Sequence, residues 1–294
     1  MILLTGAAGK TGQAILHALV KYDENVRVFV RTPEQLAVLT GFGASDAVIG
    51  DLRDQAALSK AGQGCEKFYF ICPNITPDEV QIGKNLLEIA RKVDAQRFVY
   101  HSVIHPHIES MPHHWQKMRF EELLLESGID FTILQPCAYM QNVLSNWKEI
   151  VEKGVYAIPY STSSRISMVD LDDVAEAAAK VLIEKKHANA IYELAGSKPL
   201  SQDDVASILS TGLKIEVTAK SIERTSWTEN ARSSYLSTIQ IETLVRMFEY
   251  YEKHGLVGNS NVLELLLGRP VTTFLDFVKR QIPQTQEIFS GGKR

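Results

Sequence analysis

The sequence has few cysteines and no excess of positive charge. Its 3 cysteines among 294 residues are an odd set without C-x-x-C spacing, which argues against a disulfide framework or a zinc site and favours reduced thiols. Lysine and arginine number 31 against 35 aspartates and glutamates, so the formal net charge is −4. Because binding to phosphodiesters needs clustered positive charge, nucleic acid is not an expected ligand.

Long apolar runs are also missing. No stretch approaches the roughly 20 apolar residues of a membrane span, so we expect no membrane partner. The opening residues 1–6 lack a basic segment and have only a short apolar run, unlike a secretory signal, so we expect a cytoplasmic protein. The 45% hydrophobic and 22% charged content is typical of a globular chain with one large α/β core and a smaller lobe.

Short β-branched and aromatic runs alternate with longer amphipathic stretches in the first half of the chain. The predicted strands are residues 2–5, 26–30, 47–49, 68–71, 98–102, 131–134 and, later, 191–194. Between them lie stretches such as 78–93, in which apolar residues recur at helical spacing. The alternation predicts a Rossmann-type, doubly wound parallel sheet whose ligands bind at the carboxyl ends of the strands.

The pattern changes near residue 150, where a glycine turn precedes helices and isolated strands. We predict a nucleotide-binding domain over residues 1–150, with later strand contributions near 166–170 and 190–195. Residues 151–294 are predicted to form a smaller mixed α/β substrate lobe. Since no flexible linker or internal repeat separates the two, we expect them to be interwoven.

A glycine-rich turn directly follows the first predicted strand. Residues 5–12 read TGAAGKTG, a G-x-x-G-x-x-G spacing that leads into a helical stretch over 13–22. Glycines let the backbone approach a pyrophosphate, and the helix N-terminus offers free N–H groups and a partial positive charge. A tight turn that binds nothing is the alternative. The residues predicted to bind a dinucleotide here are Gly6, Ala8, Gly9, Lys10, Thr11 and Gly12.

The residue after the second strand indicates which dinucleotide is bound. Arg31 stands where an NAD site usually has an acidic residue for the ribose 2′-hydroxyl. A guanidinium suits a 2′-phosphate, so NADP(H) is predicted over NAD(H), and a solvated arginine is the alternative. After the third strand, Asp51 and Leu52 could contact the adenine ring or could simply form a polar turn.

One cluster of histidines and one dispersed set of aromatic residues are further candidates for a site. Five histidines fall in one segment, but the only acidic support there is Glu109, so no metal site is predicted. These histidines are His101, His105, His107, His113 and His114. A dispersed aromatic set could line an apolar substrate pocket or belong to the core. Its members are Trp147, Trp227, Tyr235, Tyr250 and Tyr251.

The chain resembles an atypical short-chain dehydrogenase/reductase of the NmrA-like group over most of its length. The segments that carry the resemblance are 5–12, 26–32, 50–54, 133–142, 166–181, 192–196 and 263–277. The resemblance implies an NADP-binding Rossmann domain, and the group contains quinone and carbonyl reductases as well as non-catalytic redox sensors. It also implies that residues after the fourth and sixth strands pass the cofactor, namely Cys72, Pro73, Asn74 and Pro136. Cys72 could instead be a reactive thiol or a small buried hydrophobe.

The catalytic signature of the wider superfamily, a serine with Tyr-x-x-x-Lys, is incomplete. Lys117 is in register with the lysine, but His113 stands in place of the tyrosine. The resemblance implies that Lys117 keeps its contact with the nicotinamide ribose and that Ser102 stays near the reacting carbon. His113, with an ordinary pKa near 6.5, is a candidate proton donor, and Tyr139 is another. Alternatively, His113 and Lys117 form a solvated helix start.

These features predict an NADPH-dependent reductase of a small, planar or aromatic acceptor such as a quinone or carbonyl compound. The nicotinamide would supply the hydride, and the protein would supply orientation. A non-catalytic NADP(H) sensor that binds a partner protein is the first alternative, because the tyrosine is missing. A nucleotide-sugar epimerase is the second, although its chemistry depends on that tyrosine. We expect a monomer or a homodimer.

Overall fold

The computed structural model describes residues 1–233 and 236–290. The chain divides into two compact units. The first combines Met1–Pro136 with Leu171–Leu194, and the second combines Cys137–Asp170 with the chain from Ala195 onward. The units therefore separate at Pro136, whereas the sequence-based boundary stood at residue 150. Among the described helices, none combines the length and apolar character that a bilayer-spanning segment needs.

A seven-stranded parallel sheet forms the centre of the first unit, in the order β3-β2-β1-β4-β5-β6-β10. Its strands are β1 (Ile2–Leu4), β2 (Val26–Val30), β3 (Asp46–Ile49), β4 (Lys67–Phe70), β5 (Arg97–His101), β6 (Phe131–Pro136) and β10 (Ala190–Leu194). All seven predicted strands are present, and the predicted Rossmann-type fold is confirmed. The strand order reverses between β1 and β4, which makes the carboxyl ends of these strands the expected ligand site.

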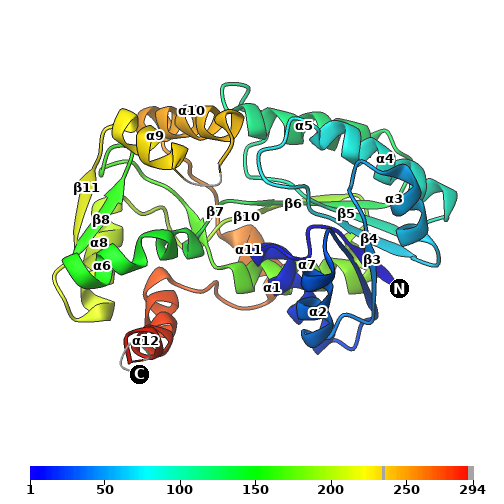
Figure 1. Ribbon diagram of the computed structural model, residues 1–294, viewed down its shortest axis with the longest axis horizontal. Coiled ribbons are helices and arrows are strands. Elements are labelled where there is room, and N and C mark those ends of the chain that lie inside the picture. Colours follow the sequence, from blue (N-terminus) through cyan, green and yellow to red (C-terminus); the bar gives the residue numbers. More distant parts are fainter. Residues whose placement is uncertain (234–235, 291–294) are drawn as a thin grey trace. The chain divides into compact units, whose positions relative to one another are not determined.

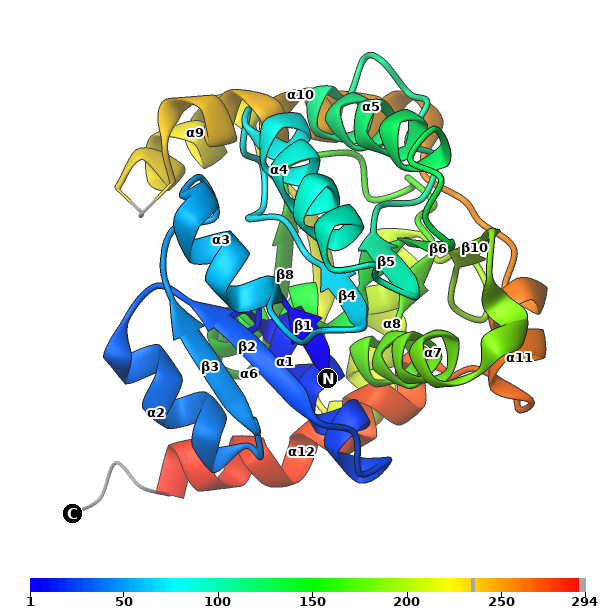
Figure 2. The same cartoon turned by 90° about the vertical axis from the view of Figure 1, so that its right-hand side faces the viewer.

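Helices cover both faces of this sheet (Figure 1 and Figure 2). One face carries α1 (Lys10–Lys21), α2 (Pro33–Gly41) and α7 (Leu171–Ile183), followed by the short η2 (Lys185–His187). The other carries α3 (Gln55–Gly62), α4 (Glu79–Lys92) and α5 (Pro112–Leu125). Because both faces are covered, the strands read as almost continuous apolar runs.

The close approach of α4 to α5 depends on a glycine. A Cβ on Gly83 would lie 2.1 Å from a ring carbon of Phe120, so the ring occupies the space that a side chain would need. Phe120 is fully buried and packs edge to face on Phe70 and Tyr100, with ring centroids 5.2 and 4.6 Å apart. This packing fixes the register of α5 against α4 and against β5.

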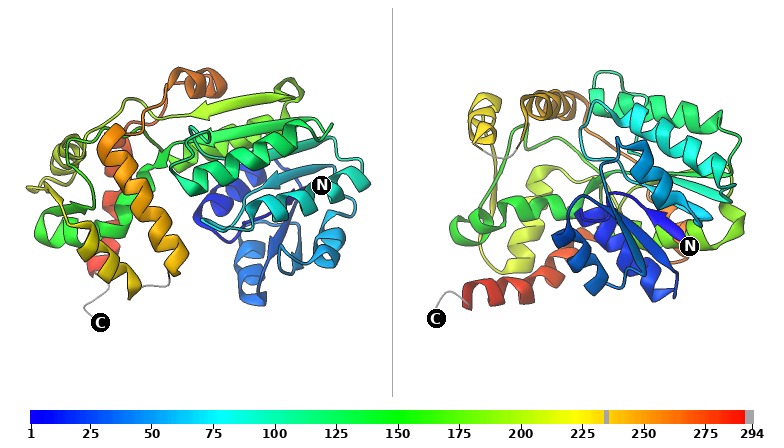
Figure 3. Two further views of the ribbon diagram at one scale, coloured as in Figure 1. Left: turned by 90° about the horizontal axis from the view of Figure 1, so that it is seen from above. Right: turned by 45° about the vertical axis from the view of Figure 1, so that its right-hand side comes forward.

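The second unit contains two small parallel pairs, β8 (Val155–Ile158) with β11 (Thr218–Ser221) and β7 (Ala138–Tyr139) with β9 (Met168–Val169). Of the later segments predicted to contribute strands, 166–170 holds β9 in this unit and 190–195 holds β10 in the sheet. The helices of the second unit are η1 (Met140–Asn146), α6 (Trp147–Lys153), α8 (Gln202–Leu213), α9 (Arg224–Arg232), α10 (Thr238–His254), α11 (Asn261–Leu267) and α12 (Phe274–Ser290). Helices α9 and α10 lie side by side (Figure 3).

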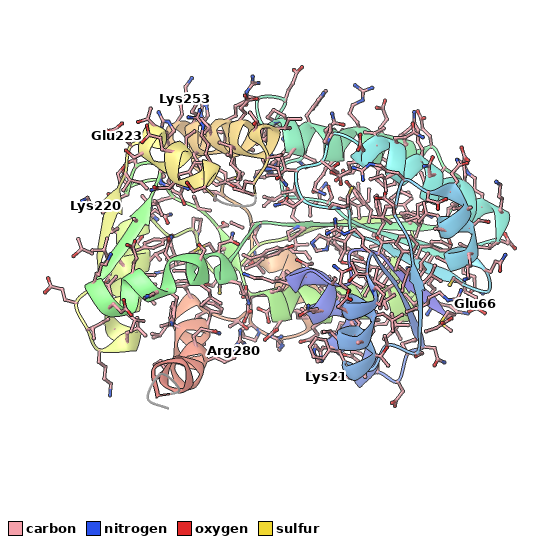
Figure 4. The ribbon with its side chains drawn as sticks, in the orientation of Figure 1. Lys21, Glu66, Lys220, Glu223, Lys253 and Arg280 are labelled. Carbon is pink, nitrogen blue, oxygen red and sulfur yellow. The ribbon has the colours of Figure 1, made fainter. Side chains whose placement is uncertain are left out.

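A buried carboxylate ties the C-terminal helix into the second unit. Asp170 is fully buried and accepts hydrogen bonds from Gln141 Nε2 at 2.8 Å and from Arg280 Nη2 at 2.6 Å. Arg280 lies on α12, as labelled in Figure 4. Because a buried charge is costly unless it is paired, this contact stabilises the docking of α12.

Candidate functional site

The glycine-rich turn joins β1 to α1, and two of its glycines are required by the packing of the chain. Gly6 has φ +64°, in the left-handed region, and a Cβ there would lie 2.8 Å from Ile71 Cβ. A Cβ on Gly12 would lie 2.3 Å from the carbonyl oxygen of Gly6. These two glycines therefore have a structural reason that needs no ligand.

Gly9 is different, because the fold does not require a glycine there. It is exposed, its φ and ψ are −78° and 163°, and its Cβ would meet only Gly6 O at the ordinary contact distance of 3.5 Å. Gly9 is also the N-cap of α1, and no described side chain caps this helix. The N–H groups of Lys10 and Thr11 in its first turn therefore have no partner within the helix and can meet an anion.

Thr5 is a further residue of this turn, one that the predicted binding set leaves out. Its buried hydroxyl donates to the carbonyl oxygen of Ile71 at 3.0 Å and accepts from the N–H of Ile71, also at 3.0 Å. The bonds fix the end of β1 to the chain that leaves β4. Threonine directly before the first glycine is the signal in the sequence that could have identified this brace.

The residues that follow β2 and β3 lie at the same sheet edge. Arg31 is exposed, and its guanidinium forms no ion pair within the described part of the chain. The backbone N–H of Arg31 donates to Gln35 Oε1 at 2.8 Å. The carboxylate of Asp51 accepts the N–H of Arg53 at 2.8 Å, which is the main cause of its lowered pKa, and the Arg53 and Arg31 charges add to the effect. Leu52 is buried in the core. Asp51 and Leu52 thus both have structural roles in a polar turn.

The segment after β4 begins with a buried thiol. Burial, with the nearby Glu79 carboxylate, raises the pKa of Cys72 well above its usual range, so the thiol is neutral at physiological pH. This favours the small buried hydrophobe over the reactive thiol. Pro73 and Asn74 are exposed beyond it. Pro136 is buried at the end of β6, and its carbonyl oxygen accepts the N–H of Ile104 at 2.9 Å.

Lys117 lies on α5, and its ammonium group reaches the carboxyl end of β5, where it joins a group of buried polar residues. Its Nζ donates to Glu79 Oε1 at 2.7 Å and to the carbonyl oxygen of His101 at 3.3 Å. The hydroxyl of Tyr100 donates to the same carboxylate oxygen at 2.6 Å, and Lys117 Nζ stands 5.4 Å from the centre of the Tyr100 ring. The Glu79 and Lys117 side chains are 3% and 16% exposed, so this is not the solvated helix start that was the alternative.

Ser102, which directly follows β5, takes part in a second buried group with Glu121 of α5 and Gln135 of β6. Its hydroxyl donates to the carboxylate of Glu121, which also accepts from Gln135 Nε2 at 3.0 Å at each oxygen. All three residues are buried. Burial raises the pKa of Glu121, and the hydrogen bonds from Ser102 and Gln135 oppose the rise. Glu121 lies one turn after Lys117, a spacing that places both side chains on one face of α5.

The structure corrects the chemical basis on which His113 was expected to donate a proton. His113 lies in the first turn of α5, where burial, helped by the charges of His114 and Lys117, lowers its pKa to about 3. The pKa of His101 is also lowered to about 3 and that of His114 to about 4, mainly by burial. These rings are neutral at pH 7, because their pKa values lie well below the ordinary value near 6.5.

The other sequence candidates fall in the second unit or outside the described residues. Tyr139 is half-buried in β7. Of the aromatic set, Trp147 and Tyr251 are buried, and Trp227 packs edge to face on Phe248 with ring centroids 4.8 Å apart; Tyr235 lies outside the described residues. Among the described side chains, no group of three or more His, Cys, Asp and Glu is arranged to hold a metal ion.

Comparison with known proteins gives consistent similarities over nearly the whole chain. The model of the NmrA-like family matches residues 1–280. Quinone oxidoreductase 2 of Escherichia coli is 27% identical over 280 residues, which cover 95% of this chain and 97% of that protein. The NAD(P)H azoreductase of Xenophilus azovorans is 28% identical over 287 residues, with 95% and 97% covered. The crystal structure of the E. coli NADPH-dependent quinone oxidoreductase complexed with NADPH matches with a TM-score of 0.83, 26% identity, and 95% and 99% covered.

Proposed function

The chain belongs to the NmrA-like family, and from this membership together with its site we propose that it is an NADPH-dependent reductase of quinone-type acceptors. Two relatives support the acceptor class, since one is named a quinone oxidoreductase and the other an azoreductase. Both are matched over 95% of this chain. The substrate is accordingly a small molecule with a conjugated, easily reduced group.

The observation that carries the proposal is the uncapped N-terminus of α1 beside an exposed glycine that packing does not require. Gly9 leaves room at the first turn, where the N–H groups and the helix dipole favour the two linked phosphates of a dinucleotide. Arg31, directly after β2, offers an exposed guanidinium that has no ion-pair partner among the described residues, and such a group suits the 2′-phosphate of NADPH. The residues present therefore fit this cofactor, and Lys10 adds a second exposed positive charge nearby.

The bound nicotinamide would supply a hydride, and the side chains at the ends of β5 and β6 would orient it. In the proposed arrangement Lys117 donates to the ribose, and buried Pro136 backs the ring. Ser102 has already committed its hydroxyl proton to Glu121, and His113 is neutral at pH 7. A quinone suits such a site, because hydride transfer would leave a hydroquinone monoanion, which is stabilised and can wait for a proton from solvent. The alkoxide formed from a simple ketone needs a positioned acid.

The proposal is tested by mixing the protein with NADPH and a panel of quinones, azo compounds and aldehydes, and by following the loss of nicotinamide absorbance. We expect turnover with quinones, and we expect Lys117→Ala to lower kcat/KM by about a hundredfold. Lys84→Ala, which removes an exposed lysine from α4, is the matched control and should behave as wild type. Absence of turnover with every acceptor would refute the reductase.

The alternative functions give different results in the same assay. A sensor would bind NADP+ and NADPH with different affinities, show no turnover, and retain a partner protein. An epimerase would interconvert nucleotide sugars without net oxidation of the cofactor. Sedimentation of the pure protein would distinguish the two predicted oligomeric states, monomer and homodimer.

A further inference from the structure

We infer, on the basis of the proposed function, that Glu79 and Tyr100 are positioning residues that hold Lys117 in place for NADPH. Neither residue belongs to the expected serine and Tyr-x-x-x-Lys signature. Tyr100 comes from β5 and Glu79 from the first turn of α4. The site thus keeps a tyrosine near its lysine, but this tyrosine acts through a carboxylate.

The donor count of Lys117 leaves one hydrogen for a ligand. A lysine ammonium has three N–H donors and no acceptor. One donates to Glu79 Oε1 at 2.7 Å and one to the carbonyl oxygen of His101 at 3.3 Å. These two bonds fix the direction of the third N–H. Because the side chain is 16% exposed, that N–H still has access to a ligand.

Three features stabilise a negative charge on Glu79 in this buried position. Its side chain is 3% exposed, and an isolated carboxylate there would be strongly unfavourable. The positive end of α4, the hydroxyl of Tyr100 and the ammonium of Lys117 offset that cost. Loss of one partner would leave an uncompensated charge, so the carboxylate restrains the lysine strongly.

Tyr100 cannot act on a substrate directly. The residue is fully buried, and its hydroxyl donates to Glu79 at 2.6 Å. Burial, followed by the Glu79 charge, holds the pKa of Tyr100 well above its usual range, so it keeps its proton. It serves as a donor that fixes the carboxylate, while its ring lies 5.4 Å below the Lys117 ammonium.

The packing of α4 on α5 makes this arrangement rigid. The ring of Phe120 fills the space left by Gly83. Gly83 lies one helical turn after Glu79, and Phe120 lies three residues after Lys117. Because the contact fixes the register of the two helices, it also fixes the distance between the carboxylate and the ammonium.

The inference is tested with Glu79→Gln, which keeps the shape of the side chain and removes its charge. Two quantities are measured: the affinity for NADPH by calorimetry, and the rate at which an acetylating ester modifies Lys117 in the protein without cofactor, followed by peptide mass spectrometry. We expect affinity to fall about tenfold and acetylation to become several times faster. With Lys117→Ala already present, Glu79→Gln should weaken NADPH binding no further, because the two residues act as a unit.

Matched variants separate this role from general damage. Glu88→Gln makes the same change at an exposed position of α4 and should alter neither quantity. Tyr100→Phe removes only the hydroxyl, and it should weaken NADPH binding and speed acetylation of Lys117 to a smaller extent. This variant replaces Glu79→Gln if the latter fails to fold. Tyr156→Phe removes another buried hydroxyl, bonded to Gln202 at 3.0 Å in the second unit, and should leave both quantities unchanged.

Unchanged acetylation in Glu79→Gln would overturn the inference, and so would faster acetylation with unchanged NADPH affinity. Effects of Glu79→Gln and Lys117→Ala that simply add would also overturn it. The acetylation rate needs neither cofactor nor turnover. Failure of the wild-type protein to reduce any acceptor would therefore count against the proposed function and leave the Glu79 result to be judged separately.

Discussion

The glycine turn after β1 and the lysine site after β5, formed by Lys117, Glu79 and Tyr100, lie at the same edge of one parallel sheet. They differ in the groups that form them. The turn is made of backbone: its features are a left-handed Gly6, a close contact of Gly12 with Gly6 O, and free N–H groups at the start of α1. The lysine site is made of buried polar side chains from α4, β5 and α5.

Under the proposed function, one sheet edge would bind two parts of a dinucleotide, its pyrophosphate and its nicotinamide ribose, by separate physical means. Backbone amides do not titrate, and their N–H groups can donate to the oxygens of any pair of linked phosphates. Buried charges depend on pairing and on packing between helices. Substitutions that add volume should therefore have their main effect at the turn. Loss of a charge and a change of pH should have their main effect at the lysine site.

The largest expected effect belongs to Gly12→Ala. The new methyl would lie 2.3 Å from Gly6 O and 2.5 Å from the Cα of Ala7, and backbone cannot move aside as a side chain can. We expect the free energy of unfolding to fall by about 3 kcal/mol, as measured by urea denaturation. Gly41→Ala, where nothing lies within 4 Å, should lose no stability; equal stability of both variants would show that the turn is looser than described.

The next effect is a pH dependence of the free energy of unfolding that arises from His113 on α5 and not from the glycine turn. The pKa of His113 is lowered to about 3, so between pH 6.5 and that value the unfolded chain binds more protons than the folded chain. The stabilising contribution is complete above pH 6.5 and is lost as the pH falls toward 3. We expect His113→Asn to recover about 1 to 2 kcal/mol of the stability that wild type loses between pH 7 and pH 5.

His17→Asn is the control for the pH experiment, because His17 is an exposed histidine of α1, the helix that follows the glycine turn. Its loss of stability on acidification should match that of wild type. Denaturation curves at pH 7, 6 and 5 supply the measurement. If His113→Asn and wild type lose stability in parallel, the ring of His113 is not held neutral by burial.

Arg31→Ala tests the cofactor choice at the turn. Loss of a charge-assisted bond to the 2′-phosphate should weaken NADPH binding about tenfold or more and leave NADH nearly unchanged. Calorimetry with both nucleotides measures this. Arg119→Ala, which removes an exposed guanidinium from α5, should change neither affinity. Equal weakening of NADPH and NADH by Arg31→Ala would mean that Arg31 does not read the 2′-phosphate.

The smallest expected effect is that of Gly9→Ala, and it gives the sharpest contrast with Gly12→Ala. Its methyl has room in the fold but would point into the space proposed for phosphate. Binding of NADPH and NADH should weaken about fivefold, with the free energy of unfolding within about 0.5 kcal/mol of wild type. A stability loss like that of Gly12→Ala would show that Gly9 serves packing, not a ligand.

The same contrast explains what could be predicted from the sequence. The strands and the glycine turn are local patterns. The predicted strand bounds agree with the structure to within two residues, whereas α1 begins at Lys10, three residues before the predicted helix start. Glu79 and Lys117 are 38 positions apart, and their contact depends on the fit of Phe120 against Gly83, which no local periodicity reveals. The neutral state of His113 likewise follows from tertiary burial. Within the lysine site, the i,i+4 spacing of Lys117 and Glu121 is a pattern that the sequence does show.

Calorimetric titration of the wild-type protein with NADPH and NADH, combined with thermal unfolding in the presence of each, measures whether the start of α1 binds a pyrophosphate. If the amides at the start of α1 bind a pyrophosphate, we expect saturable heat with NADPH, weaker binding of NADH, and a rise in melting temperature with both. If neither nucleotide gives heat or raises the melting temperature at millimolar concentration, the start of α1 does not bind a dinucleotide.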